Sequence, residues 1–184
     1  NDEAGSMRGP FEELLTQMVE HDVPFDAIGF QGHFGSVLTP PEEMLQILDR
    51  FAKFGKPIWI TEFDVDIRDQ QMQAQFTRDF YITMFSHPSV EGILMWGFWD
   101  GRHWKYNAPI YNADWTLKPS GEAWIDLIFN EWRTQEDGQT DEQGRYGIRG
   151  FLGDYELEVR FGDRTVKREI ALTREGTSIH VVLD

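Results

Sequence analysis

The stretch that decides the fold is IWITEFDV, residues 58–65. Its apolar and β-branched residues are typical of a buried strand, yet Glu62 and Asp64 stand near its end. Because side chains alternate between the two faces of a strand, both carboxylates are expected on the same face. Two acids there indicate a functional site. The alternative interpretation is that Glu62 lies at the end of the strand and pairs with a surface cation.

A second strand is predicted upstream, over residues 26–34, where Gln31 and His33 repeat the same-face pattern. Residues 40–51 lie between the two strands and have apolar residues at helical spacing, with prolines at the start and Gly55 after the end. Strand, helix and strand form a βαβ unit, whose parallel strands have their carboxyl ends at one edge. We therefore expect a single polar cluster, made of Gln31, His33, Glu62 and Asp64.

A third strand is predicted after another helix. That helix covers residues 68–85, and its stripe of Met72, Phe76, Phe80 and Met84 is more typical of a packing surface than of a cofactor site. Residues 90–104 then begin as a buried strand and open into a loop with three tryptophans. Indole faces stack on sugar rings while polar neighbours bind the hydroxyls. We expect sugar contacts from Trp96, Trp104, Asp100, Arg102 and His103, and a place in the core for Trp99.

These residues resemble glycoside hydrolase family 10, whose members are mostly retaining endo-β-1,4-xylanases on a (β/α)8 TIM barrel. The segments that carry the resemblance are residues 1–2 (end of the fifth strand), 11–19 (the helix after it), 28–33 (sixth strand), 59–64 (nucleophile strand), 94–98 (eighth strand) and 120–129 (last barrel helix). The resemblance extends to about residue 133. It implies an α/β fold, namely a partial TIM barrel that holds strands five or six to eight with their helices.

The resemblance also implies a role for each matched residue. Glu62 would be the nucleophile that forms the glycosyl-enzyme intermediate, His33 would bond to its carboxylate, and Asp64 would support His33. Gln31 would contact the sugar at the cleavage site, and Trp96 and Trp104 would line the glycone subsites. The secreted or periplasmic location of the family is implied as well, although the sequence shows no signal segment.

A retaining glycosidase needs a second carboxyl group about 5 Å from the nucleophile, acting first as acid and then as base. In the resembled family this Glu lies on the fourth strand, which would precede residue 1. We therefore expect the nucleophile-bearing half of an endo-1,4-β-xylanase, whether a natural half, a shortened form or a nicked fragment. The alternative is a half barrel that only binds carbohydrate or only assembles. Open sheet edges predict a partner: the missing N-terminal half, a second copy in a homodimer, or the tail of the chain.

The tail differs in composition from the rest. Residues 133–144 are polar and rich in turn formers, which is typical of a linker. Alternation then predicts strands at 154–160, 165–172 and 178–183, joined by turns into an antiparallel meander. We expect a structural appendage more than a carbohydrate-binding module. The predicted domains are therefore residues 1–133 and 134–184.

The composition excludes several functions. With 17 basic and 32 acidic residues the net charge is −15, which argues against nucleic acid and anionic membranes as partners and suits a neutral substrate such as xylan or a xylo-oligosaccharide. There is no cysteine for disulfides or thiol catalysis, and no apolar run that could span a membrane. The His and carboxylate residues lack the spacing of a metal site, so we predict no catalytic metal and no cofactor.

Overall fold

The computed structural model of the protein describes residues 2–182, with side chains from residue 7 onward. The chain divides into two compact units, Asn1–Leu127 and Ile128–Asp184, which are described separately. Within the described residues, no helix has the length and the apolar content needed to cross a membrane.

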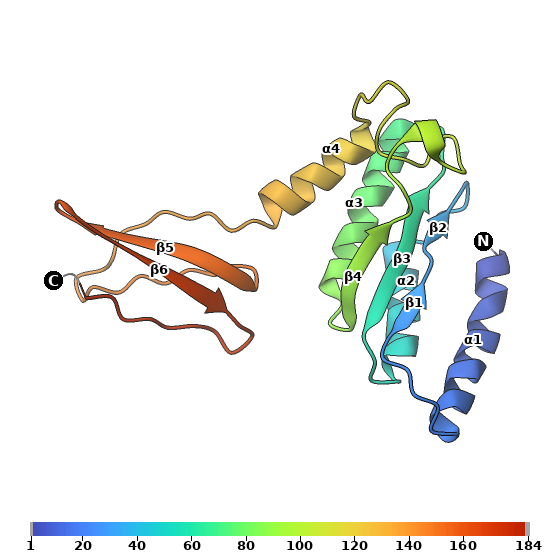
Figure 1. Ribbon diagram of the computed structural model, residues 1–184, viewed down its shortest axis with the longest axis horizontal. Helices are drawn as coiled ribbons and strands as arrows, with labels where there is room; N and C mark the ends of the chain where they lie inside the picture. Colours follow the sequence, from blue (N-terminus) through green and yellow to red (C-terminus); the bar gives the residue numbers. More distant parts are fainter. Residues whose placement is uncertain (1, 183–184) are drawn as a thin grey trace. The chain divides into compact units, whose positions relative to one another are not determined.

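The first unit is built on a parallel sheet with β3 (Ile58–Val65) at its centre. On one side, β1 (Ile28–Phe30) and β2 (His33–Phe34) pair with β3 one after the other, and on the other side β4 (Val90–Met95) does so. Figure 1 shows these strands side by side with the helices behind them. The unit is therefore an α/β structure with parallel strands, as the βαβ pattern predicted.

The strand predicted over residues 26–34 is interrupted. β1 ends at Phe30 and β2 begins at His33, because Gly32 adopts a positive φ of 84°. A side chain at Gly32 would also come within 2.8 Å of the Ile60 methyl group, so both the backbone conformation and the limited space favour glycine here. After this kink the register places His33 directly opposite Asp64 of β3.

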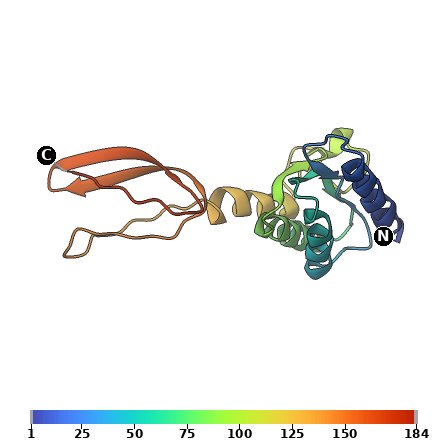
Figure 2. The same ribbon diagram turned by 90° about the horizontal axis from the view of Figure 1, so that it is seen from below.

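Two helices cover one face of the sheet, α2 (Pro41–Ala52) and α3 (Gln70–Ser86). Figure 2 shows both on the same side of the strands. α3 begins at Asp69, whose carboxylate accepts hydrogen bonds from the amides of Gln71 and Met72. Phe80 stacks on Phe63 of β3 with ring centroids 4.3 Å apart, so aromatic packing joins this helix to the sheet.

One member of the predicted packing stripe on α3 was assigned wrongly. Phe76, Phe80 and Met84 are buried, but Met72 is 54% exposed. The fully buried residue of this first turn is Gln73, whose amide nitrogen donates to the carbonyl of Val65 (2.9 Å) and to that of Asn107 (2.6 Å). The start of α3 thus faces loop backbone that needs hydrogen bonds, which an apolar side chain does not supply.

The first helix, α1 (Asp2–Glu20), begins much earlier than residues 11–19, where a helix was predicted. Asp2 is therefore helical and not the end of a strand, and Asn1 lies outside the described residues. Phe11 of α1 packs against Phe30 and Phe51, which fixes the helix to β1 and α2. Figure 1 shows α1 beside the β1 and β2 edge of the sheet.

The last helical segments are α4 (Pro119–Ile125) and the π-helix η2 (Asp126–Glu131), where the chain passes from the first unit to the second. Together they take the place of the helix predicted at residues 120–129. They follow the long loop after β4, which contains the short 3-10 helix η1 (Asp100–Arg102).

The second unit is an antiparallel hairpin of β5 (Gly153–Phe161) and β6 (Arg164–Leu172), with the turn at Gly162. The third strand predicted at 178–183 is wrong for residues 178–182, which have no regular structure, and residue 183 lies outside the described range. Gly176 closes a turn on Thr173, and the Thr177 hydroxyl then donates to the Ala171 carbonyl. Alternation indicates that a segment suits a strand, but it does not supply the neighbour with which to pair.

Candidate active site

His33 lies between two carboxylates at the carboxyl end of β3. Its Nε2–H group donates to Oε2 of Glu62 over 3.2 Å, and its Nδ1 atom lies 3.1 Å from Oδ2 of Asp64. The second contact lacks the geometry of a hydrogen bond, so we treat it as electrostatic. Glu62 and His33 are partly exposed, whereas the Asp64 side chain is 1% exposed. The three side chains thus run from a buried acid to one that solvent or a ligand can reach.

The strands place this triad through backbone contacts. The Glu62 amide donates to the Gln31 carbonyl (2.9 Å), and the Asp64 amide donates to the Gly32 carbonyl (3.2 Å). The pairing of β3 with β4 shifts register between Ile60 and Phe63, so the alternation of buried residues is broken around Glu62. The parallel arrangement therefore brings Gln31, His33, Glu62 and Asp64 to one edge, as their spacing indicated.

Asp64 is enclosed by polar partners from the loop that follows β4. The Trp104 indole donates to Oδ2 over 2.8 Å, and the Lys105 ammonium lies 3.5 Å from Oδ1. Because its oxygens face His33, Trp104 and Lys105, Asp64 orients its neighbours and is not open to a ligand.

Gln31 contributes its backbone more than its side chain. The carbonyl accepts a hydrogen bond from the Glu62 amide, while the side chain is exposed and its amide has no hydrogen-bond partner among the side chains described for residues 7–182. Its predicted contact with a sugar stays a prediction.

Two exposed tryptophans flank the triad. The Trp104 and Trp96 rings lie edge-on to the His33 ring, with centroids 5.0 Å and 6.2 Å away. Both line a pocket of about 420 Å³ in the loop after β4. Its side chains come from Trp96, Phe98, Trp99, Arg102, His103, Trp104 and Trp115. A hollow of this size and aromatic content is typical of a small-ligand site.

His103 and Asp100, both predicted to contact sugar, have partners within the protein. The buried His103 ring approaches the Trp96 carbonyl with Nε2 (3.0 Å) and accepts the Lys105 amide at Nδ1 (3.1 Å). Asp100 accepts a hydrogen bond from the buried Lys118 ammonium at 2.7 Å. These contacts shape the loop, and a role for either residue in ligand binding stays a prediction.

Trp99 and Trp115 form the outer wall of the pocket. Their rings stack with centroids 4.8 Å apart and 10° between planes, and the Trp99 indole donates to the Ala113 carbonyl. Trp99 therefore packs in the loop and not in the core of the unit. Trp115 has a positive φ of 67°, which is rare for a bulky residue, and it is 57% exposed.

Sequence reasoning did not single out Trp115, Lys105 or Lys118. Each lies in irregular backbone, where no periodicity indicates which way the chain folds back. The only available signal was local: Trp115 follows Asn112-Ala113-Asp114, a run of turn formers. Across residues 2–182, no three His, Asp or Glu side chains converge in a way that would hold a metal ion.

Comparison with known proteins finds relatives of this chain. Residues 2–134 match the profile of Glycosyl hydrolase family 10. The chain is 42% identical over 148 residues to Anti-sigma-I factor RsgI6 of Acetivibrio thermocellus, which covers 79% of this chain and 19% of that protein. It is 29% identical over 175 residues to Endo-1,4-beta-xylanase 1 of Arabidopsis thaliana, covering 95% of this chain and 18% of that protein.

A similar structure has also been solved. Native xylanase 10B from Thermotoga maritima superposes with a TM-score of 0.59 at 27% identity, over 71% of this chain and 44% of that one. The chain thus spans only a minor part of each of these relatives. The profile match covers most of the chain and includes the whole His33, Glu62 and Asp64 cluster, and the chain belongs to glycosyl hydrolase family 10.

Proposed function

We propose that this chain carries the nucleophile of a retaining endo-1,4-β-xylanase. The observation that carries the proposal is the contact of His33 with both Glu62 and Asp64 at the carboxyl end of a parallel strand, in a chain of family 10. The proposed substrate is β-1,4-xylan. We infer this substrate from the names of the Arabidopsis relatives, which are endo-1,4-beta-xylanases, and from the xylobiose complex of xylanase 10B from Thermotoga petrophila.

In the proposed reaction, a carboxylate oxygen of Glu62 bonds to the anomeric carbon while the bond from that carbon to the glycosidic oxygen breaks. The leaving oxygen takes a proton from a general acid. Water that gives up a proton to the same group then attacks the anomeric carbon and releases Glu62, with net retention of configuration. His33 bonds to Oε2 of Glu62 and Asp64 holds His33, so the nucleophile is in place before the sugar arrives.

The proton donor is proposed to come from outside these 184 residues. A retaining pair of carboxyl groups stands about 5 Å apart. Asp64, the acid that shares His33 with Glu62, is enclosed by Trp104 and Lys105. We accordingly propose that β1 with β2, β3 and β4 form part of a (β/α)8 barrel that other strands complete.

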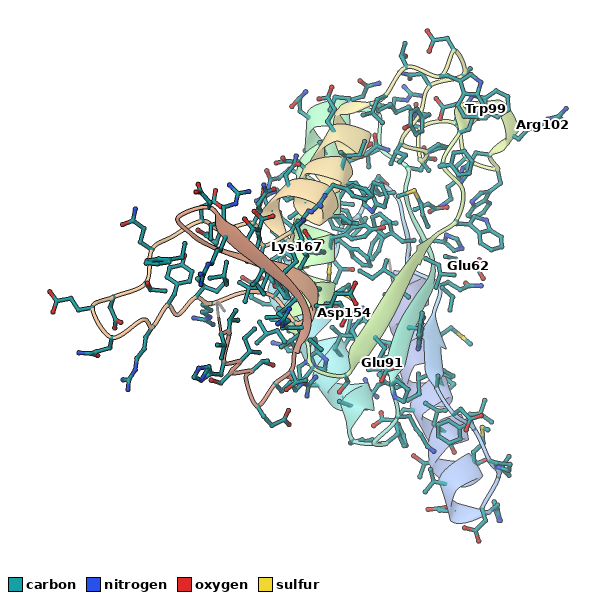
Figure 3. The ribbon with its side chains drawn as sticks, turned by 60° about the vertical axis from the view of Figure 1, so that its left-hand side comes forward. Glu62, Glu91, Trp99, Arg102, Asp154 and Lys167 are labelled. Carbon is teal, nitrogen blue, oxygen red and sulfur yellow. The ribbon has the colours of Figure 1, made fainter. Side chains whose placement is uncertain are left out.

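A mechanism-based label tests Glu62 without the general acid. A dinitrophenyl 2-fluoro-xylobioside carries a leaving group that departs without protonation, while the fluorine slows hydrolysis of the glycosyl-enzyme. We expect the chain to gain one glycosyl mass on the peptide that contains Glu62. Glu62→Gln should abolish the adduct. Glu91→Gln should keep it, because Glu91 lies near the start of β4, far from the carboxyl ends of the strands where Glu62 lies (Figure 3). An adduct on another residue would remove Glu62 from the mechanism.

A second candidate is sugar binding without turnover. It is favoured by the 42% identity to a protein named as an anti-sigma factor, which is a regulator and not a xylanase by name. The exposed Trp96 and Trp104 rings offer stacking surfaces for binding of this kind. Xylo-oligosaccharide titration followed by tryptophan fluorescence separates the two candidates: saturable binding with no covalent label supports this second function.

The sheet of the first unit also predicts a partner. Leu94 of β4 is 49% exposed, and Trp59 of β3 is exposed beside it, although both belong to strands of largely apolar residues. We propose that a second copy of the chain or a companion barrel segment covers these residues. Light scattering over a range of concentrations should show a mass rising toward twice 21.5 kDa for the isolated chain. A constant mass of 21.5 kDa would contradict self-association.

A further inference from the structure

The loop after β4 contains one cation that the protein itself does not use. Lys118 pairs with Asp100 at 2.7 Å, and Lys105 lies 3.5 Å from Asp64. Arg102, which precedes both lysines in the sequence, is exposed, and among the side chains described for residues 7–182 no carboxylate lies within ion-pair distance of its guanidinium. Because Arg102 lines the pocket in a chain of net charge −15 and has no ion-pair partner among residues 7–182, its positive charge is available to a ligand.

Arg102 stands on a firmly held segment. It ends η1, and its amide bonds back to the Trp99 carbonyl. The Asp100 amide donates to the Tyr111 carbonyl, and its carboxylate binds the buried Lys118. Figure 3 shows Arg102 on the loop beyond the strand ends, with its side chain directed away from the ribbon. The base of the side chain is therefore fixed while its guanidinium is free to meet a ligand.

The pocket links Arg102 to the proposed catalytic cluster. Trp96 and Trp104 line the pocket and also contact the ring of His33, which binds Glu62. Arg102 lines the same pocket, next to the stacked rings of Trp99 and Trp115. A sugar chain that passes Glu62 over these indole faces would thus present its next residues or branches to a guanidinium.

A guanidinium has a specific preference in such a place. It binds a carboxylate through two parallel N–H···O bonds, whereas the hydroxyls of a neutral xylan do not need a positive charge. The overall negative charge of the chain repels acidic ligands, so an acidic sugar needs a local cation to bind well. Uronic acids are sugars with a ring that stacks on indole and a carboxylate that suits arginine.

Building on the proposed function, we propose that Arg102 recognises the carboxylate of a uronic-acid branch on a xylan backbone. The site selects xylan that carries acidic branches over plain xylan, and the stacked Trp99 and Trp115 supply the surface for the sugar rings near the branch.

Calorimetric titration of the whole chain with three ligands tests this inference. The ligands are xylotetraose, xylotetraose with one glucuronic acid branch, and tetragalacturonate, whose acids lie in the backbone. We expect the branched ligand to bind about tenfold more tightly than xylotetraose at low ionic strength, and the advantage to shrink as salt is added. Arg102→Gln should remove the advantage, so that the affinity for the branched ligand falls much more than that for xylotetraose, and Arg102→Lys should keep part of it.

Arg174→Gln is the matched control, since it makes the same change of charge at an exposed arginine of the second unit and should leave the preference intact. Equal affinity for branched and plain ligands overturns the inference and leaves the proposed function standing. Binding of neither ligand overturns both. Binding of tetragalacturonate as tightly as the branched xylotetraose also overturns the inference, because the site would then recognise any acidic sugar chain and not specifically a branch.

Discussion

β3 in the first unit and the hairpin in the second both carry glutamates, in opposite surroundings. In β3, Glu62 follows the buried Ile60 and contacts the imidazole of His33. In the hairpin, Glu156 and Glu158 lie 2.9 Å and 3.3 Å from the Lys167 ammonium across the strands, and both Glu156 and Lys167 are exposed. Glu62 in its apolar strand has one defined partner, His33, whereas the glutamates of the alternating hairpin share Lys167 on a charged surface that tolerates exchange. Four predictions test this difference.

The largest effect is expected from the two glutamates themselves. Glu62→Ala should lower the release of dinitrophenol from a dinitrophenyl xylobioside by several orders of magnitude, because the covalent route is lost. Glu158→Ala makes the same change in the hairpin and should leave the rate unaltered. The variant lacking Glu62 should recover activity in azide and form an α-glycosyl azide, since azide fits the space of the lost carboxylate. Equal rates for wild type and Glu62→Ala would contradict the proposed nucleophile.

A second pair of substitutions compares packing in the two regions. Phe80 is 1% exposed and stacks on Phe63, so Phe80→Ala should lower the free energy of unfolding by about 3 to 5 kcal/mol. Phe161 at the end of β5 is 74% exposed, and Phe161→Ala should change the free energy of unfolding by less than about 0.5 kcal/mol. Urea titration followed by tryptophan fluorescence measures both. Similar losses for the two variants would mean that the hairpin is buried in the protein as it exists in solution.

The sequence predicted the parallel part of the site well, and for a physical reason. Period-two alternation and the shared edge of parallel strands are enough to bring His33 to Glu62 and Asp64 without knowledge of any loop. The aromatic wall was only partly predictable, because Trp115 reaches Trp99 through irregular backbone with a positive φ. The buried Gln73 was missed, since its position depends on loop carbonyls that periodicity does not reveal.

The third prediction concerns alkaline pH and the core of the first unit. Burial raises the pKa of Tyr81 from 10.0 to about 12, and the nearby Trp124 indole offsets part of this rise. Above pH 10 the unfolded chain loses this proton while the folded chain keeps it, so stability is complete below pH 10 and falls as the pH rises toward 12. The loss should reach roughly 2 to 3 kcal/mol. Tyr81→Phe should flatten this part of the pH profile measured by urea titration, and an unchanged profile would contradict the assignment to Tyr81.

The smallest effect is expected at Lys167, which holds the charged contacts of the hairpin. Hydrogen bonds to Glu156 and then to Glu158 raise the pKa of Lys167, but Lys167 and Glu156 are exposed, so water screens the attraction. Lys167→Ala should therefore leave amide hydrogen exchange in β5 and β6 unchanged, at low and at high salt. Val159→Ala, which shortens a half-buried side chain opposite Val166, should accelerate that exchange. If Lys167→Ala accelerates exchange as much as Val159→Ala does, the charged contacts of Lys167 stabilise the hairpin as specifically as His33 holds Glu62. The contrast between the two regions would then fail.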